Sequence, residues 1–473
     1  MLKLLAKVWL GINSAYVSLK NRAYFAYREK ILARKLIFTF FLLVIFIVCG
    51  TITIPGLKLL QFQLDSNSFL GIINTVGGGG LLNFSVVALG ISPFITASLF
   101  MLIAQTKLFP PIHRLSQSGP AGRRKINIIT RFLTLLVAVI QAVVLIRTVI
   151  LNPDYGFVRL EINTPVFIWL VLPLVLVAGS LFSLFLAEQI TDKGVGNGTS
   201  LLIFSGIVVG LPRRFQHAFE YLVDLSFSSS LISQVLSFIL YIFGFLLILL
   251  IAIYVYLAER KIPIQQTGSG MSKNIKEISI LPLKLNPAGI MPVIFALIIV
   301  SLPTLFSGFL DRNTSAVRNW IDNNMQIYHP IGLIIFIVFN VTFSIIMSLQ
   351  QSRVDKIAQD FAKNSTFIPG IRPGEQTEDY LISVVLRLSV FSAIYLTFLG
   401  ILQPVEIMLG LPSAITISGT SIIILATTTL ETISQIKARY DAQKVLKQSK
   451  KIRKNLQVRK NSPSIDSNQD LLW

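Results

Sequence analysis

Residues 68–105 form an uncharged, largely apolar stretch that is interrupted at its centre by four consecutive glycines at 77–80. A membrane helix needs about 20 continuous apolar residues, and each glycine weakens a helix by roughly 1 kcal/mol relative to alanine. The pattern predicts a short helix or re-entrant loop over 68–82 that does not cross the bilayer, followed by a span over 86–105. Broken backbone at membrane depth must be buried in protein or face a water-filled cavity. We therefore expect a cavity that holds this segment.

The rest of the chain has the composition of a protein with many membrane spans. Of its 473 residues, 53% are hydrophobic and only 14% are charged, which is typical of polytopic membrane proteins. The apolar runs predict an all-α fold with ten membrane-spanning helices, near 36–54, 86–105, 130–149, 165–187, 197–212, 231–257, 286–307, 330–350, 383–402 and 412–433.

The basic residues indicate how these spans are oriented. Of 42 lysines and arginines, 35 fall in the two tails and in the loops on the same predicted side, and 7 fall on the other side. The positive-inside rule places that basic side in the cytoplasm, which requires an even number of spans. Most of the net charge of +20 is therefore expected to face the cytoplasm, where both termini lie.

The two tails permit more than one interpretation. Residues 1–35 alternate basic with aromatic side chains, as in a helix that lies on anionic lipid or in a solvated helix. Residues 437–460 carry more basic side chains than topology requires. They fit a solvated helical extension or a contact with RNA or lipid. The polar composition of 461–473 predicts disorder.

Several classes of site lack the residues that they need. Cys49 is the single cysteine and the three histidines lie far apart in connecting loops, which argues against an internal disulfide and a metal site. The centres of the predicted spans carry no ionisable residue, which argues against an ion-coupled transporter. A solute transporter with a broken-helix site at the midplane remains the alternative. No nucleophile and base pair, phosphate loop or zinc motif indicates an enzyme or a bound cofactor.

Two cytoplasmic loops, near 258–285 and 352–381, are too long to be simple connections. The first begins with a basic pair, Arg260 and Lys261. The second contains a Pro- and Gly-rich turn, PGIRPG, whose prolines would hold Arg372 away from the surface. Such loops suggest docking sites, although they could also cap a cytoplasmic vestibule.

Five segments resemble SecY, the family of channel subunits of the bacterial preprotein translocase. These segments occur in the family's order, so chance similarity is an inadequate explanation. The resemblance as a whole extends over roughly residues 36–440. The five segments read ALGISPFITAS at 88–98, AEQITDKGVGNGTSLLIFSGIV at 187–208, LPLKLNPAGIMPVIFA at 281–296, IPGIRPGEQT at 368–377 and GTSIIIL at 419–425.

The resemblance implies a channel made of two pseudo-symmetric halves of five helices each, with the glycine-rich segment as a plug. An isoleucine in a membrane helix ordinarily packs or faces lipid, so only the resemblance assigns a ring of pore residues. The ring positions are Ile91, Ile95, Thr199, Ile203, Ile294 and Ile424. The plug positions are Val76, Gly77, Gly78, Gly79 and Gly80. Threonine at 199 departs from the family's apolar pattern, and we expect it to make the seal slightly wetter.

The resemblance also implies a gate that opens sideways between spans two and three and spans seven and eight. Gln141 and Asn286 match polar gate positions, whereas Leu102 replaces a usual polar residue. Ordinary hydrogen bonding between helices would explain the same polar residues. Arg260, Lys261 and Arg372 would dock a ribosome or the SecA ATPase. The implied partners are the small SecE and SecG subunits, polypeptides with signal sequences and anionic lipid, with SecDF and an insertase as further associates.

The expected organisation has five parts. A basic amphipathic segment over 1–35 precedes a first channel half over 36–212, an external linker over 213–230, a second half over 231–435 and a basic cytoplasmic tail over 436–473. In its details, the amino-acid sequence is most similar to SecY sequences of small, wall-less bacteria. This similarity predicts a location in the bacterial plasma membrane, with a plastid thylakoid membrane as the alternative.

Overall fold

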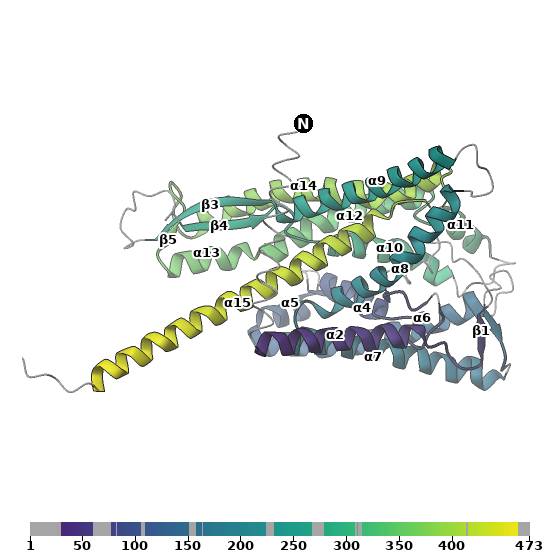
Figure 1. The fold of residues 1–473 in the computed structure, drawn as a ribbon, viewed down its shortest axis with the longest axis horizontal. Coiled ribbons are helices and arrows are strands. Elements are labelled where there is room, and N and C mark those ends of the chain that lie inside the picture. The colour runs from purple at the N-terminus through teal and green to yellow at the C-terminus, as the bar shows by residue number, and fades with distance from the viewer. Residues whose placement is uncertain are drawn as a thin grey trace, which may run out of the picture.

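The computed structural model describes residues 30–59, 77–81, 83–105, 109–150, 158–162, 164–223, 231–266, 279–307, 310, 315–412 and 415–461. The fold is mainly helical, as predicted (Figure 1). The α-helices are α2 (Lys30–Thr51), α4 (Ser92–Ala104), α5 (Pro110–Gln117), α6 (Gly119–Leu145), α7 (Leu172–Lys193), α8 (Gly198–Leu222), α9 (Leu231–Leu257), α10 (Met291–Ser307), α11 (Ala316–Asn324), α12 (Pro330–Ser352), α13 (Val354–Lys363), α14 (Glu375–Met408) and α15 (Gly419–Asn461). Two π-helical turns adjoin these helices. The turn η1 (Ile146–Ile150) extends α6, and the turn η2 (Phe167–Val171) precedes α7.

Within the part of the chain that the structure describes, six helical segments are long and apolar enough to cross a membrane. They are Leu32–Thr51, Gly119–Thr148, Phe167–Lys193, Ile232–Leu257, Pro330–Lys363 and Glu375–Met408. Two further apolar helices, α4 and α10, are shorter. Each predicted span overlaps one helix, but α8 and α15 combine apolar and strongly polar parts, so the number ten stays a prediction.

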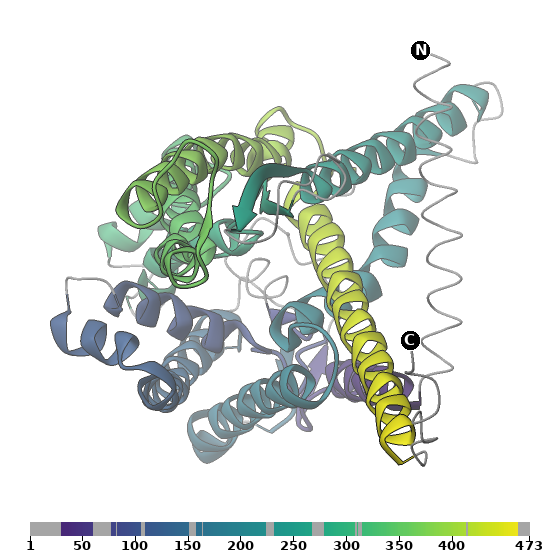
Figure 2. The ribbon, with the colours of Figure 1, turned by 90° about the vertical axis from the view of Figure 1, so that its left-hand side faces the viewer.

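The long helices form two groups. The first contains α2, α4, α6, α7 and α8, and the second contains α9, α10, α12, α14 and α15. The first group is the purple and blue part of Figure 1, and the green helices of the second group lie above it in Figure 2. The groups meet along two edges, where α8 contacts α9 and α15, and where α10 contacts α4 and α6.

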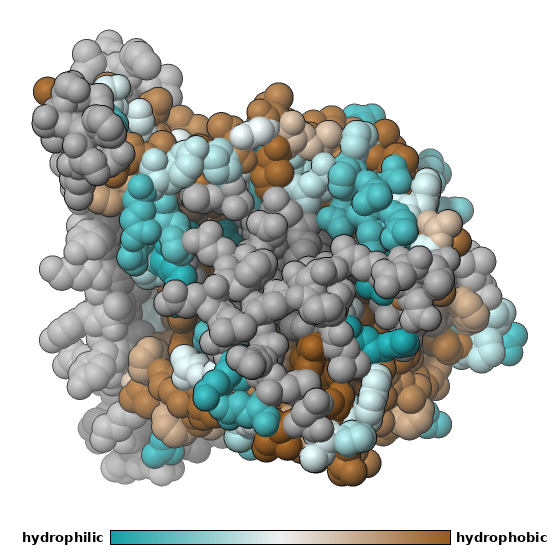
Figure 3. Space-filling model, turned by 90° about the vertical axis from the view of Figure 1, so that its right-hand side faces the viewer, coloured by the Kyte–Doolittle hydropathy of each residue, from teal (hydrophilic) through white to brown (hydrophobic). Residues whose placement is uncertain are grey.

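Apolar side chains cover much of the outside of both groups. Phe40 of α2 is 69% exposed, Ile232 of α9 is 89% exposed and Ile394 of α14 is 66% exposed. Figure 3 looks onto the end that carries β1 and α11, and apolar residues appear around its margin. Exposed apolar surface of this extent suits lipid and not water, so the chain is a membrane protein.

The span predicted over 86–105 is helical only from Ser92. Residues 85–91 form successive tight turns, in which the Ala88 N–H donates to the Ser85 carbonyl oxygen and the Gly90 N–H donates to the Val87 carbonyl oxygen. Gly90 has φ +51°, which favours glycine, and proline follows at the second position of α4. This local chemistry delays the helix although the residues are apolar.

The helix that contains the predicted fifth span continues beyond residue 212, so the described part of the predicted linker over 213–230 is helical up to Leu222. Helix α8 continues past Pro212 to Leu222. Phe215 packs edge to face on Phe245 of α9 at 5.3 Å between ring centroids, and Phe219 packs on Phe238 at 5.1 Å. These aromatic contacts stabilise the extension and offset the hydrogen bond that proline removes.

Two small sheets were not predicted by the apolar pattern. Strand β1 (Leu57–Leu59) pairs antiparallel with β2 (Val158–Leu160), and Leu57 lies opposite Leu160. The second sheet has the order β4-β3-β5, with β3 spanning Glu259–Gln266, β4 Ser279–Lys284 and β5 Thr366–Phe367. Both sheets lie in connections between long helices, where strands of a few residues are hard to distinguish from loops.

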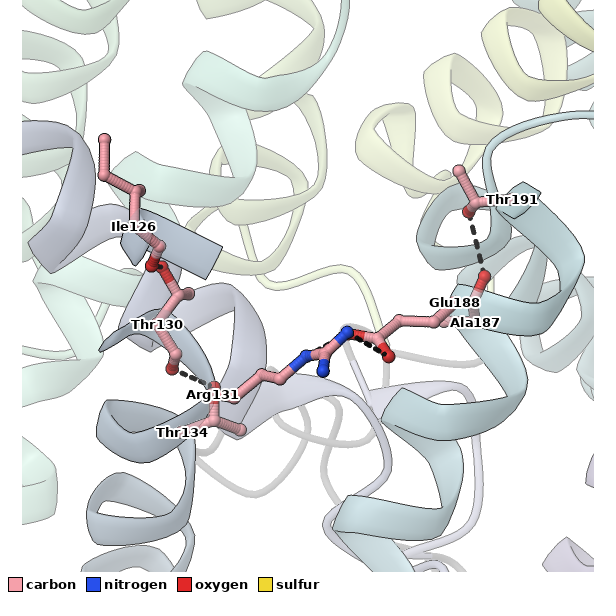
Figure 4. Close-up of polar contacts among 7 residues, drawn as sticks. All are labelled: Ile126, Thr130, Arg131, Thr134, Ala187, Glu188 and Thr191. Carbon is pink, nitrogen blue, oxygen red and sulfur yellow. Dashed lines mark hydrogen bonds and ion pairs between the residues drawn. The ribbon is translucent and has the colours of Figure 1, made fainter. Parts of the chain in front are cut away.

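An ion pair joins α6 to α7 near the predicted cytoplasmic end of the first group. The Arg131 Nε and Nη2 atoms donate to the two carboxylate oxygens of Glu188 at 2.8 and 2.9 Å (Figure 4). Thr130, Thr134 and Thr191 donate instead to backbone carbonyl oxygens four residues earlier. The two parallel hydrogen bonds between the guanidinium and carboxylate groups fix the register of α6 and α7. Because both side chains are partly exposed to solvent, the ion pair adds little to the stability of the fold.

Some predicted regions fall outside the described residues. These are most of the segment 1–35, the part of the predicted plug over 68–76 with residue 82, and residues 462–473. The basic tail begins within α15, which continues as a helix to Asn461, as a helical extension requires.

The aromatic pairing of α8 with α9 yields a test of the fold. Replacement of Phe215 by alanine removes edge-to-face contacts with Tyr241 and Phe245, which should lower the free energy of unfolding by about 1–3 kcal/mol. Thermal unfolding in detergent would measure the change. Phe398→Ala is the control, because Phe398 is 62% exposed on α14. Equal shifts for both variants would contradict the role assigned to the aromatic contacts.

Candidate functional site

The five isoleucines predicted to line the pore belong to one buried cluster. Ile91 lies in the turn before α4, and the other four lie one each on α4, α8, α10 and α15. They therefore come from both helix groups, although they are spread over more than 300 positions of the sequence. Their exposed fractions are 0% for Ile91, 6% for Ile95, 2% for Ile203, 3% for Ile294 and 4% for Ile424. The structure therefore brings these side chains together between the two helix groups.

Thr199 lies in the first turn of α8, one helical turn before Ile203. Its N–H and its hydroxyl both donate to Oδ1 of Asn197, the N-cap residue, at 3.2 and 2.8 Å. Residues four apart share one helix face, so the threonine continues the line of Ile203 toward the first residue of α8. Its hydroxyl is already bonded to Asn197, which lessens its demand for water.

The described part of the glycine-rich segment packs against both α8 and the turns before α4. A methyl group on Gly206 of α8 would overlap the carbonyl group of Gly78, and one on Gly90 would overlap the carbonyl oxygen of Gly77. Gly78 has φ +94° and lies against Phe46 of α2. Glycine is needed at these positions because backbone meets backbone. Val76 lies outside the described residues.

The two predicted gate residues do not bond to each other. Gln141 of α6 donates to the Thr96 hydroxyl of α4 at 3.3 Å, within the first group. Asn286 accepts from the Ser392 hydroxyl of α14 at 2.7 Å and donates to the Gly289 carbonyl oxygen at 2.9 Å, within the second group. Each amide therefore fastens its own side of the α4–α10 edge, and a hydrogen-bonded latch across that edge stays a prediction.

Thr96 and Ser392 were missed by the sequence interpretation. Both are buried polar residues in apolar helices, and that contrast was the signal that could have identified them. Among the described residues, the buried Gln141 Oε1 atom has no hydrogen-bond partner. A buried acceptor without a partner is energetically costly.

The connection before α12 covers the end of the cluster that is predicted to face outward. Ile327 is 3% exposed, and Tyr328 packs against the same apolar side chains. Burial raises the pKa of the Tyr328 phenol, and the nearby Arg214 guanidinium opposes this shift only in part. The phenol is therefore neutral at physiological pH and adds no charge to the apolar cluster.

The structure joins the two predicted docking loops in one sheet. Strand β3 of the first loop pairs with β5 of the second, where Gln265 lies opposite Phe367. Arg260 and Lys261 are exposed on β3, and Arg372 is exposed in the turn that precedes α14. The turn is closed by a hydrogen bond from the Thr377 hydroxyl to the Arg372 carbonyl oxygen at 2.8 Å.

An apolar cluster anchors the sheet β4-β3-β5, which is predicted to face the cytoplasm, to the long helices. Ile262 of β3, Ile368 and Leu381 of α14 are 2%, 4% and 1% exposed and pack together. The three cationic side chains thus stand on a rigid support and not on independent loops. Among the residues described, no group of three histidine, cysteine, aspartate or glutamate side chains could hold a metal ion.

These features define a helical membrane protein in which two groups of helices enclose a buried apolar cluster, beside a packed glycine-rich segment. Comparison with known sequences is specific. The model of the SecY family matches residues 85–433, so the chain belongs to the SecY family.

Individual relatives agree with this assignment. The chain is 37% identical to the protein translocase subunit SecY of Mycoplasma capricolum over 455 residues, which covers 93% of each protein. It is 34% identical to the protein translocase subunit SecY of Bacillus subtilis over 414 residues, which covers 86% of this chain and 94% of the relative. Neither relative is named as a solute transporter, and the transporter alternative has no support.

Solved structures share the fold at lower sequence identity. A protein-conducting channel superposes with a TM-score of 0.61 at 19% identity, over 85% of this chain and 91% of that one. Sec61 in a canine ribosome-channel complex superposes with a TM-score of 0.59 at 19% identity, over the same shares.

The contact between Gly78 and Gly206 yields a second test. Gly206→Ala should lower the free energy of unfolding by about 1–3 kcal/mol, because its methyl group would collide with backbone of the glycine-rich segment. Gly210→Ala, one turn later on α8, is the matched control, because nothing lies within 4 Å of the added carbon. Thermal unfolding of the two variants would show the difference, and a stabilised or unchanged Gly206→Ala would refute the close packing.

Proposed function

We propose that this chain is the protein-conducting subunit of a translocase. It passes unfolded secretory polypeptides across the membrane and releases apolar segments sideways into the bilayer. The observation that carries the proposal is the buried cluster in which Ile91, Ile95, Ile203, Ile294 and Ile424 meet between the two helix groups. Membership of a family whose members are named translocase subunits supports it.

An apolar ring can both seal and conduct. At rest, closely packed isoleucine side chains exclude water, and ions do not cross a dewetted constriction. During transport the same side chains can part for a sliding chain, because they form no hydrogen bonds that depend on its sequence. Thr199, bonded to Asn197, adds a polar group to one end of the ring without leaving an unpaired hydroxyl.

The glycine-rich segment acts as a plug in this proposal. Gly77, Gly78 and Gly80 are buried beside α8 and the turns before α4. Backbone contacts of this kind hold the segment closely without large side chains that would have to be withdrawn. The segment is thus placed where it could close the channel at rest and move aside when a polypeptide enters.

Sideways release depends on the edge where α10 meets α4 and α6. A signal sequence about as apolar as a membrane helix would enter this edge and part the groups. Gln141 and Asn286 are the polar groups that line the two sides in this proposal. Partition is then set by composition, since a charged residue costs about 2.5–3.5 kcal/mol at the bilayer centre and leucine or isoleucine returns roughly half a kcal/mol.

The chain needs an external driving force, because it carries no nucleotide-binding motif. We assign docking of a ribosome or of SecA to the cytoplasmic sheet, where Arg260, Lys261 and Arg372 are exposed. SecE and SecG would brace the helix groups, and anionic lipid, SecDF and an insertase would associate with the complex. We assign this sheet and both termini to the cytoplasmic side of a bacterial plasma membrane, because most lysine and arginine residues lie on that predicted side.

Crosslinking tests the path of the polypeptide. In a Cys49→Ser background, a cysteine that replaces Ile294 should form a disulfide with a single cysteine placed midway in a stalled secretory chain. Ile394→Cys is the control, because Ile394 is 66% exposed on α14. Crosslinking at both positions, or at neither while the chain is demonstrably engaged, would reject the proposed path.

Charge reversal tests the docking surface. Arg372→Glu should weaken binding of SecA or of a ribosome by about tenfold, or about 1.4 kcal/mol, because it opposes an anionic partner surface. Lys356→Glu on α13 is the matched control, since Lys356 is also exposed. Sedimentation with proteoliposomes would measure both. An equal loss for the two variants would indicate general electrostatics instead of a docking residue.

A further inference from the structure

In the loop between α7 and α8, residues 194–197, three backbone N–H groups donate hydrogen bonds to acceptors on three different helices. The Gly194 N–H donates to the Ile190 carbonyl oxygen at 2.9 Å, and the Val195 N–H donates to the Thr39 hydroxyl of α2 at 2.9 Å. The Gly196 N–H donates to Gln435 Oε1 of α15 at 3.2 Å. This is the KGVGNG segment of the sequence, to which the proposed function gives no role.

Helix α15 binds the same loop a second time. Arg439, one turn after Gln435, donates from Nη1 to the Gly194 carbonyl oxygen. Two side chains of the second helix group thus form hydrogen bonds with the backbone of a loop from the first group. Gln435 accepts a hydrogen bond and the cationic Arg439 donates one. Hydrogen bonds from a charged group are stronger than neutral ones.

Apolar packing shields these bonds. Val195 is 0% exposed and Leu32 of α2 is 2% exposed. Ile436 and Tyr440 of α15 pack against them. Gly196 has φ +94° and its Cα hydrogen faces Thr432 and Leu201, so a larger residue is excluded there. The loop, α2 and α15 therefore form one corner, which we name the α15 clasp: Leu32, Thr39, residues 194–197, Gln435, Ile436, Arg439 and Tyr440.

The α15 clasp lies next to the start of a helix that supplies the ring. Asn197, the last residue of the loop, is the N-cap of α8, and Thr199 and Ile203 follow in its first two turns. Helix α15 carries Ile424, and α8 and α15 pack against each other. Any shift of α15 relative to the loop would therefore change how Ile203 meets Ile424.

We propose that Arg439 is a positioning residue for the closed pore. By holding the loop 194–197 on α15, it fixes the α8 and α15 parts of the ring relative to each other. The ring then widens by movement of its other members, on α4 and α10. This inference rests on the proposed function, since it assigns Arg439 a part in the seal of a polypeptide channel.

The test is Arg439→Met, which removes the donor but keeps most of the volume. The assay uses the complete translocase in proteoliposomes, with SecA and ATP. We expect the ion leak through the resting channel to rise about tenfold, since loss of a charge-assisted bond of about 1.4 kcal/mol shifts an equilibrium by that factor. Transport of a precursor with a weakened signal sequence should also increase, while transport of the normal precursor stays within twofold.

Three variants separate this role from a general loss of structure. Lys437→Met is the matched control, because Lys437 is exposed on the same helix, and it should leave the leak unchanged. Arg439→Lys should restore much of the seal, because an ammonium group can donate to the same carbonyl oxygen. Gln435→Met should raise the leak independently, because it leaves the Gly196 N–H without its acceptor.

The outcomes are distinct. If the unaltered translocase fails to transport the normal precursor, the proposed function fails. If it transports normally and neither Arg439→Met nor Gln435→Met raises the leak, only the role of Arg439 is overturned. A leak that Arg439→Lys does not reduce, or that Lys437→Met reproduces, also overturns it, because the effect would then not depend on the hydrogen bond.

Discussion

The fold depends on the need to satisfy every backbone N–H and C=O group where water is absent. Helices meet this need by themselves, so the interesting positions are those where the helix is interrupted. The turns over 85–91 bond within themselves, and the loop 194–197 borrows acceptors from Thr39 and Gln435. Irregular backbone is thus found where other elements enclose it, and these enclosed positions adjoin α4 and α8, which contribute Ile95 and Ile203 to the buried apolar cluster.

The two helix groups use polar side chains differently from apolar ones. The five isoleucines of the predicted ring belong to one buried apolar cluster that draws residues from both groups. By contrast, Gln141 bonds to Thr96 and Asn286 bonds to Ser392 within their own groups. Hydrogen bonds between the groups are found at the α15 clasp, from Gln435 and Arg439 to the loop 194–197, whereas the contact within the isoleucine cluster is apolar. Such a contact can open and close repeatedly without leaving many donors or acceptors exposed to lipid.

Apolar run length was sufficient to predict most long helices, and the residues described around the four glycines form turns instead of a continuous helix. The helix boundaries were less predictable, because they depend on partners that are distant in sequence. Phe215 continues α8 beyond Pro212 by packing on α9, and no local pattern contains that information. The cluster of isoleucines was assigned through resemblance alone, since isoleucine at 203 or 424 looks the same in sequence as one that faces lipid. Arg439 appeared only as one cation in a basic tail.

The sheet β4-β3-β5 can form only late in the synthesis of the chain. Strand β3 ends at Gln266, but its edge is covered by β5, at Thr366 and Phe367. Chain growth proceeds from the amino end, so about a hundred residues must be added before this sheet can close. The support for Arg260 and Lys261 is then completed by α14, which begins at Glu375. A chain that has not yet added β5 and the start of α14 therefore cannot present the finished sheet.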